Sequence, residues 1–580
     1  MINVSEILKD DNLLFYDIES FKEDALVVFK DIQNKVVGIF HNDFEGMYEV
    51  IQGKTLVGFN NYFYDDPMLE KMLACWTPQQ LKEQNDRLIS GQKVKIYRLG
   101  NEITTLDCFQ QADVSMPSLK KIEANMGANI YESLIDFNID RKLTEEELEE
   151  TIQYCSYDVQ MTIEIFKKRL KDYFEPKLNI IAMLDESIQR RAIRWNTTTI
   201  SANLVTNGKP LQQWSDVRLG EYDETGEYDM FELVPGPVKA FWKENATKDK
   251  GKYVHEEFGC KIEFGFGGLH GVPIRNKVRY KNVKMLDVAS LYPNIINKLD
   301  VLGGRTQFYK ENLVDKRLAI KHTDKTLSAA LKLVINSIYG LLRSDYSLLK
   351  NKMGAISVCI YGQIILYDLC KRLAPTCEIV NINTDGVGFV TDSDDYIKVW
   401  EEWQDDYGFV LELDEFETFI QKDVNNYIAV EPSGGIKAKG GEVGRYGYEN
   451  VFRNNSNRIV DIAIGEYLLH DQEPLDTILE RLNEPKLFQQ VLQAGGTYKG
   501  TFDEHGKQYQ KVNRVFPVKR GGVKLYKRRQ DDGMVMFPDA PEQMLVWNYE
   551  VDDLEDFKNK IDINYYYTLI NKKLERWKVL

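Results

Sequence analysis

The sequence is poor in the residue patterns that build disulfide-stapled, zinc-binding or membrane-spanning proteins. Its 7 cysteines include no Cys-x-x-Cys pair, and its 6 histidines include no His-x-x-x-His pair. Neither a disulfide framework nor a structural zinc site is expected, so any bound metal must be held mainly by carboxylates. The longest apolar stretch, Met353 to Cys370, is interrupted by Gln363 and Asp368. We therefore predict a buried helix there rather than a membrane span.

Other absences bound the class of protein. Only 16 prolines and 39 glycines occur among 580 residues, of which 43% are hydrophobic and 28% charged. Disordered and low-complexity classes are excluded, and at roughly 100 to 200 residues per domain three or more structural units are expected. The first residues, MINVSEILKDD, lack a basic region followed by an apolar core. No secretory signal is expected, which favours a cytoplasmic location.

An overall excess of basic charge is also missing. Lysine and arginine number 74 against 90 acidic residues, which gives a net charge of -16. Taken alone, this disfavours nucleic acid, whose phosphates attract basic surfaces. The segment 511–529, however, contains eight basic residues and no acid. We interpret it as a surface that contacts duplex phosphates, the alternative being an exposed hairpin without a ligand.

Acidic residues recur at defined places near the start of the chain. Residues 12–21, 25–29 and 36–40 are β-branched and aromatic runs that predict an N-terminal antiparallel sheet. Asp17 and Glu19 are two positions apart on the first strand, so alternation sends both carboxylates to one face. Two such acids repel each other unless a cation lies between them. A solvated strand face is the alternative interpretation.

Two further acids follow. Asp65 lies four residues after Asn61, at a loop or a helix start. Residues 143–170 predict an amphipathic helix that begins with a capping box. On that helix Tyr154 and Asp158 are four positions apart and therefore neighbours. A hydroxyl beside a carboxylate is well placed to orient a water molecule.

These residues resemble the three motifs of the DEDD 3′-5′ exonuclease domain, in the version with tyrosine in the third motif. The resemblance implies that four acids hold two divalent ions, Mg²⁺ or Mn²⁺, namely Asp17, Glu19, Asp65 and Asp158. It also implies that Tyr154 positions the attacking water, and that the segments 104–108 and 117–121 contact a single-stranded DNA 3′ end. Some relatives carry a lysine before the third motif, for which Lys142 is the candidate.

A second group of candidate residues lies farther along the chain. Asp287 ends a short apolar strand, and the segment 378–392 predicts a strand, a tight turn and a strand with Asp385 at the tip. One helical face carries Lys332, Asn336 and Tyr339. Another short helix carries Arg317 and Lys321 four positions apart. Cations, an amide and an aromatic ring suit a triphosphate and a base, although each element alone has an ordinary structural explanation.

In their order and combination these elements resemble family B (alpha-like) DNA polymerases of compact phage type. Motif A is residues 287–293, motif B is residues 332–340 and motif C is residues 383–385. The resemblance implies an α/β and α+β multidomain fold, with a ribonuclease H-like exonuclease domain followed by a right-hand polymerase. The implied boundaries are 1–175 for the exonuclease, 176–260 for a linking region, 261–304 and 346–440 for the palm, 305–345 for the fingers, and 441–580 for the thumb and C-terminal region.

The resemblance also implies roles for single residues. Two Mg²⁺ ions would be held by Asp287, Asp385 and the backbone of Val288. The phosphates of the dNTP substrate would be bound by Arg317, Lys321 and Lys332. Further residues would line the dNTP site: Ser290, Leu291, Asn336 and Tyr339. Tyr292 would lie below the sugar and exclude a ribose 2′-hydroxyl.

Three further segments resemble DNA-contacting elements of the family. Gly267 and Gly268 resemble a glycine linker between exonuclease and palm, where the backbone could approach DNA phosphates, although a glycine turn between strands is the alternative. Tyr427, Lys437 and Lys439 match primer-binding positions. Motif C departs from the family pattern because Asn383 stands where an acid is usual. We expect activity to survive, since Asp385 is the principal ligand in this family.

The sequence thus predicts a template-directed DNA polymerase with a proofreading 3′-5′ exonuclease, acting in phage genome replication in the host cytoplasm. Its expected partners are primer-template DNA, a single-stranded 3′ end and phage replication proteins. Only 38 residues (294–331) separate motifs A and B, so we expect no terminal-protein partner, and no membrane partner is expected. The alternatives are a 3′-5′ exonuclease whose weakened polymerase half serves as a DNA-binding platform, and a non-catalytic primer-template binding protein, which the retained acids disfavour.

Overall fold

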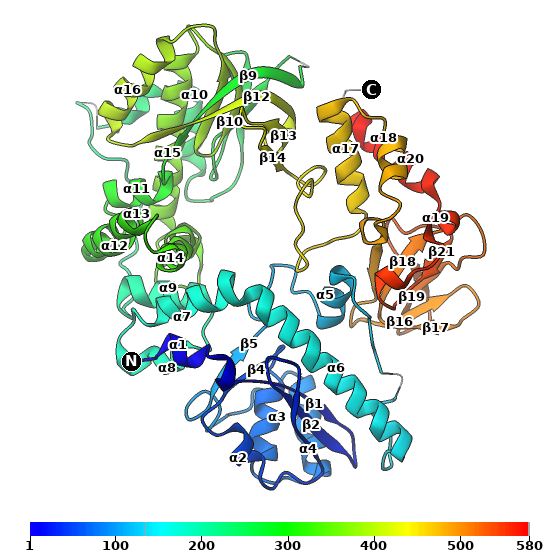
Figure 1. Ribbon diagram of the computed structural model, residues 1–580. Helices are drawn as coiled ribbons and strands as arrows, with labels where there is room; N and C mark the ends of the chain where they lie inside the picture. Colours follow the sequence, from blue (N-terminus) through cyan, green and yellow to red (C-terminus); the bar gives the residue numbers. More distant parts are fainter. Residues whose placement is uncertain (134, 225, 276, 578–580) are drawn as a thin grey trace.

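A computed structural model describes residues 1–133, 135–224, 226–275 and 277–577 (Figure 1). These residues form a mixed α/β protein with several separate β-sheets. Figure 1 shows an N-terminal sheet at the bottom, a larger central sheet at the upper left and a C-terminal module at the right, in a ring-like outline.

The N-terminal module is built on a mixed five-stranded sheet of order β3-β2-β1-β4-β5. The first three strands are antiparallel, as predicted, and β4 and β5 extend the sheet parallel to β1. Its elements are β1 Leu13–Ser20, β2 Ala25–Lys30, β3 Val36–His41, β4 Thr55–Gly58, β5 Thr104–Asp107, α1 Val4–Ile7, α2 Met47–Ile51, α3 Asp65–Met72, α4 Pro78–Ile89, α5 Leu119–Met126 and α6 Glu145–Arg169.

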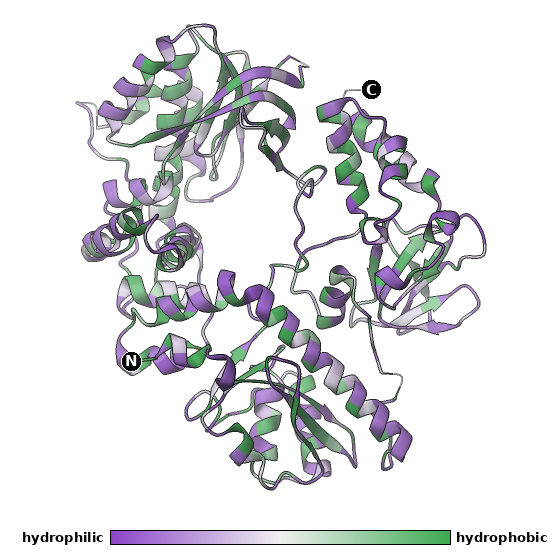
Figure 2. Cartoon of the chain, viewed as in Figure 1, coloured by the Kyte–Doolittle hydropathy of each residue, from purple (hydrophilic) through white to green (hydrophobic). Residues whose placement is uncertain are grey.

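Both faces of β1 are covered, and its alternation decides which side chains face which helix. Phe15 packs edge-on against Phe166 of α6, with ring centroids 5.3 Å apart. Tyr16 lies in the opposite core, which α3 and α4 cover. Asp17 and Glu19 have the parity of Phe15 and therefore face α6. The predicted capping box of α6 is present, with Thr144 and Glu147 exchanging hydrogen bonds, and Figure 2 shows this helix as a mixture of hydrophilic and hydrophobic residues.

Four helices follow and lead to the central sheet: α7 Glu175–Ile181, α8 Glu186–Ala192, α9 Thr197–Thr206 and α10 Gly236–Asn245. The central sheet has nine antiparallel strands in the order β14-β13-β12-β9-β11-β10-β8-β7-β6. They are β6 Tyr253–Glu257, β7 Cys260–Phe264, β8 His270–Pro273, β9 Arg279–Val288, β10 Glu378–Asn383, β11 Gly386–Val390, β12 Leu411–Asp423, β13 Asn426–Val430 and β14 Ile436–Lys439.

Helix α15 (Lys352–Leu373) lies in the main hydrophobic core. Among the described residues it is the one helix long and apolar enough to cross a membrane, yet 94% of its most apolar window is buried inside the protein. The predicted buried helix is thus confirmed. The segment between β9 and α15 forms a helical module of α11 Leu291–Lys298, α12 Thr306–Tyr309, α13 Lys316–Ile320 and α14 Lys325–Arg343, and α16 Asp395–Tyr407 packs against α15.

The C-terminal module combines helices with two small sheets of order β15-β18-β21 and β17-β16-β19-β20. The helices are α17 Arg458–His470, α18 Pro474–Glu480, α19 Phe557–Lys560 and α20 Ile563–Arg576. The strands are β15 Gln490–Gln493, β16 Tyr498–Asp503, β17 Gln508–Tyr509, β18 Val512–Pro517, β19 Leu525–Arg529, β20 Met534–Met536 and β21 Met544–Val546.

Candidate active sites

The first site lies between β1 and α6. Ligand atoms of Asp17, Glu19 and Cys155 lie within 4.8 Å of one another. Cys155, one turn before Asp158 on α6, also donates its thiol proton to the backbone oxygen of Asp17 at 3.3 Å. The parity of β1 and the helical repeat of α6 therefore bring the first and third motifs together. Cys155 was not among the site residues that the sequence predicted.

The remaining acids of this set join the same buried group. Asp65 is the first residue of α3 and is 4% exposed, and Asp158 on α6 is 6% exposed. Burial, followed by the nearby charge of Asp158, raises the pKa of Asp17 to about 8. Burial and the charge of Asp17 raise the pKa of both Glu19 and Asp65. All four predicted acids thus share one desolvated site.

This donor set fits hard divalent ions. Each carboxylate offers oxygen ligands, and several such groups buried side by side repel one another until a cation neutralises them. The raised pKa values express that repulsion together with the loss of hydration. The chemistry of the site therefore suits Mg²⁺ or Mn²⁺.

A buried lysine completes the site. Lys120, in the first turn of α5, forms ion pairs with Asp158 and, at 3.2 Å, with Glu123. It also lies 4.8 Å from the ring centroid of Tyr154. The candidate lysine, Lys142, is instead exposed just before α6. The lysine that contacts the acids of the first site is Lys120. No local sequence pattern predicts the contact of Lys120 with Asp158. The sequence predicts Lys120 only as part of the segment 117–121, as a contact of single-stranded DNA.

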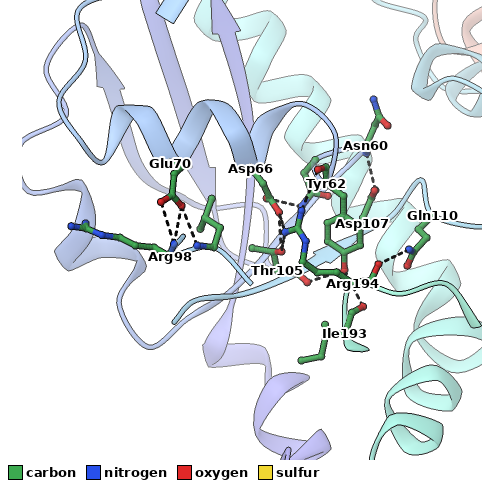
Figure 3. Close-up of polar contacts among 12 residues, drawn as sticks. Asn60, Tyr62, Asp66, Glu70, Arg98, Thr105, Asp107, Gln110, Ile193 and Arg194 are labelled. Atoms are coloured by element: carbon green, nitrogen blue, oxygen red, sulfur yellow. Dashed lines mark hydrogen bonds and ion pairs between the residues drawn. The ribbon is translucent and has the colours of Figure 1, made fainter. Parts of the chain in front are cut away.

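Asp66, the neighbour of Asp65, is fully buried and forms polar contacts with residues from several elements (Figure 3). Its carboxylate pairs with Arg194, which follows α8, and accepts a hydrogen bond from Thr105 of β5 at 2.9 Å. It also accepts hydrogen bonds from Tyr16 and from Asn61, the latter at 3.0 Å. The second motif is therefore fixed by its own asparagine, Asn61, and by Arg194 from the turn between α8 and α9.

The second site lies on the central sheet. Asp287 near the end of β9 faces Gly386 of β11, and Val288 donates its backbone N–H to the carbonyl of Asp385 at 2.7 Å. Asp385 is exposed at the hairpin tip, as predicted. Burial, and then the charge of Asp385, raises the pKa of Asp287 to about 6. Although Asp385 lies at the exposed tip, the protein around it partly desolvates its carboxylate and so raises its pKa. These two carboxylates form a second donor set that suits hard cations.

A cavity of about 230 Å³ adjoins Asp385. Its lining combines all three predicted polymerase motifs: Ser290, Leu291, Tyr292, Pro293, Ile296, Ile335, Asn336, Tyr339, Thr384 and Asp385. Tyr292 and Tyr339 stack with ring centroids 4.4 Å apart. Helices α11 and α14 thus present an amide and two aromatic rings beside the carboxylate of the hairpin tip.

The predicted phosphate-binding cations lie outside this lining. Lys321 and Lys332 are exposed, and Arg317 is half-buried. Within the described ranges none of the three forms an ion pair with an acidic side chain. Helix α13 packs against α14, so all three cations belong to the same helical module.

The glycine segment joins β7 to β8 inside the central sheet, in line with the alternative of a turn between strands. A Cβ atom at Gly268 would lie 2.3 Å from Oγ1 of Thr384. Thr384 also donates its N–H to the carbonyl of Leu269 at 2.8 Å, and its hydroxyl lies 3.2 Å from Nε2 of His270. Gly268 is therefore required for the approach of this loop to the hairpin that carries Asn383.

The predicted primer-binding residues have different environments. Lys437 on β14 pairs with Asp414 at 2.9 Å, and both Lys437 and Lys439 lower the pKa of Asp287 by their charge. Tyr427 is buried and stacks on Phe419, with ring centroids 4.9 Å apart. The two lysines thus lie beside the second site, whereas the tyrosine is part of the core.

One member of the basic segment 511–529 is not available for phosphates. Arg514 on β18 is fully buried. Its guanidinium donates to the carbonyls of Ala124 and Ala128 at 3.1 and 2.8 Å. The expectation of a DNA contact is therefore wrong for this residue, because its hydrogen bonds are directed into the protein.

No family model and no curated protein sequence matches the chain. Among solved structures, the chain is similar to the family B DNA polymerase from the hyperthermophilic archaeon Pyrobaculum calidifontis. The two are 14% identical, with a TM-score of 0.47, over 98% of this chain and 78% of that chain. The function proposed below rests on the residues of the two sites.

Proposed function

We propose that the chain is a template-directed DNA polymerase of the family B phage type with a proofreading 3′-5′ exonuclease. The observation that carries this proposal is the single cavity around which Asp385, Asn336, Tyr292 and Tyr339 meet. A mere DNA-holding surface has no need for an amide and two stacked aromatic rings beside a carboxylate. A nucleotide, in contrast, presents a base, a sugar and phosphates to such a site.

The second site would hold the incoming dNTP and the primer end. Tyr292, stacked on Tyr339, would form a flat wall against the sugar and exclude a 2′-hydroxyl. Asn336 would line the nascent base pair. Arg317, Lys321 and Lys332 would meet the phosphates from the helical module, where the cations of Lys321 and Lys332 are exposed.

The first site would hydrolyse the 3′-terminal phosphodiester of a single strand. Tyr154 would orient the attacking water, and Lys120 would keep Asp158 in place through their ion pair. Divalent ions held by Asp17, Glu19, Asp65 and Asp158, and by Asp287 and Asp385, would supply nucleophile activation and neutralisation of phosphate charge. The expected setting is phage DNA replication with primer-template DNA in the host cytoplasm.

A second candidate function follows from Asn383. An asparagine keeps an acceptor oxygen but lacks the charge of a carboxylate, so the second site has one acid fewer than the family pattern. The protein would then be a 3′-5′ exonuclease whose other half holds DNA. The retained cavity favours the polymerase.

Primer extension distinguishes the two. Purified protein is incubated with a labelled primer-template and Mg²⁺, with and without dNTPs, beside Asp385→Ala and Asp17→Ala variants. The proposal predicts extension that Asp385→Ala abolishes, and shortening without dNTPs that Asp17→Ala abolishes. Shortening alone, with Mg²⁺ and with Mn²⁺, would select the exonuclease.

A further inference from the structure

The C-terminal module forms several buried hydrogen bonds with α5, the helix that carries Lys120. Arg514 of β18 donates to the carbonyls of Ala124 and Ala128, which lie at the end of α5. The same guanidinium donates to Oε1 of Gln489 at 2.8 Å and to the carbonyl of Tyr549 at 2.5 Å. A fully buried arginine with these four acceptors ties α5 to two other segments of the C-terminal module.

Independent contacts hold the same region. Asn125 donates its amide to the carbonyls of Val451 and Arg453 at 2.9 and 2.8 Å. After the helix, the carboxylate of Glu132 accepts the N–H groups of Lys511 and Val512 at 2.8 and 3.0 Å. A small apolar cluster of Ala124, Ile130 and Val512 fills the interface.

The segment 120–132, which these contacts hold, touches residues of the first site at two points. Lys120 at its start pairs with Asp158, and Tyr131 at its end packs edge-on against Tyr154 with ring centroids 5.6 Å apart. Helix α5 has only 8 residues, too few to hold its shape without tertiary packing. Its position is therefore set by the elements packed against it, which are α6 on one side and β15, β18 and the loop 448–455 of the C-terminal module on the other.

We propose that Arg514 is a positioning residue for hydrolysis, which holds α5 and thereby places Lys120 against Asp158. The exonuclease site is then complete only when the C-terminal module is seated on α5. Any movement of that module on duplex DNA would alter hydrolysis through Lys120. This inference rests on the proposed exonuclease function.

The test measures hydrolysis of a labelled single-stranded oligonucleotide by the full-length chain. Arg514→Gln and Glu132→Ala are compared with Arg481→Gln, which removes an exposed arginine of the same module that pairs with Glu484 at 3.0 Å. We expect kcat to fall about tenfold or more in the first two, with little change in KM, because a small displacement of a catalytic group is costly. Arg481→Gln should behave as the wild type.

Two further measurements separate positioning from general damage. In a Lys120→Ala background, Arg514→Gln should cause little additional loss, because both changes remove the same contact. In an Asp17→Ala background, primer extension should be unchanged by Arg514→Gln. If Arg514→Gln does not fold, as judged by its thermal unfolding, the same comparisons with Glu132→Ala decide.

Unchanged hydrolysis in both variants, or an equal loss with and without Lys120, would overturn the inference while leaving the exonuclease intact. A wild-type protein that does not hydrolyse the oligonucleotide at all would instead overturn the proposed exonuclease, and the inference with it.

Discussion

Gly386 stands opposite Asp287 in the antiparallel pair of β11 and β9, and a Cβ atom at Gly386 would lie 1.7 Å from Oδ1 of that carboxylate. The second site therefore depends on the absence of a side chain at this position. The glycine that follows Asp385 lets two strands bring both acids together.

Replacement of Gly386 by alanine should displace the Asp287 carboxylate. We expect primer extension to fall about a hundredfold or more, with exonuclease activity retained. Gly388→Ala is a matched control on the same strand, because a Cβ there would meet Cε of Met285 at 3.1 Å and Cβ of Asn381 at 3.3 Å, contacts that a shift of a few tenths of an ångström relieves. Equal activity of the two variants would show that Asp287 does not act from this position.

Lys120 should matter for hydrolysis and Lys142 should not. Lys120→Ala leaves Asp158 without its ion pair and should lower single-strand hydrolysis about a hundredfold, the usual scale for a positioned catalytic group. Lys142→Ala removes an exposed cation and should change little. The rate of release of the terminal nucleotide is measured for both variants, and a larger loss in Lys142→Ala than in Lys120→Ala would contradict the place of Lys120 in the first site.

The first site illustrates which features could be predicted from the sequence and which could not. The shared face of Asp17 and Glu19 follows from the alternation of side chains along a strand, and the start of α6 follows from its capping box. Local sequence therefore predicts both features. Lys120 reaches Asp158 only because α5 packs across the module, which no local spacing encodes. Arg514 lies in a basic segment that resembles a solvated surface, and its burial depends on a partner surface far away in the sequence.

Metal binding should stabilise the protein in a pH-dependent way. The pKa is raised to about 8 for Asp17 and to about 6 for Asp287, from 3.8. The folded state therefore holds protons that the unfolded state has released, so the metal-free protein loses stability as the pH rises from about 4 to about 8.

Mg²⁺ binds the ionised carboxylates of the folded state, so it should raise the Tm more at about pH 8 than at about pH 6. Thermal unfolding with Mg²⁺ or EDTA measures this difference, and an Asp17→Ala, Asp287→Ala double variant is the control. The same Tm increase at both pH values, or in the control, would argue against metal at these sites.

The buried ion pair of Asp66 and Arg194 should be important for stability. Arg194→Met leaves a buried carboxylate without its cation, which costs about 3 to 5 kcal/mol. Arg98→Met, an exposed arginine also drawn in Figure 3, should change the free energy of unfolding by less than about 0.5 kcal/mol. Urea unfolding compares them, and Asp66→Asn added to Arg194→Met should recover part of the loss.

Tyr292 should select the sugar. Tyr292→Ala removes the ring that stacks on Tyr339 beside the cavity, and should increase incorporation of ribonucleotides relative to deoxyribonucleotides about tenfold or more. Tyr292→Phe keeps the ring and should keep the selectivity. Single-nucleotide incorporation with each substrate measures the ratio, and unaltered selectivity in Tyr292→Ala would exclude this role.

The central claim is that one chain holds two independent sites, and a primer with a mismatched 3′ end tests it most directly. With Mg²⁺ and all four dNTPs, the wild type should remove the mismatch and extend the corrected primer. Asp385→Ala should only shorten it, Asp17→Ala should not remove the mismatched nucleotide, and an equal mixture of the two variants should restore corrected full-length product. Failure of the mixture while each variant keeps its single activity, or corrected extension by Asp385→Ala alone, would contradict the account.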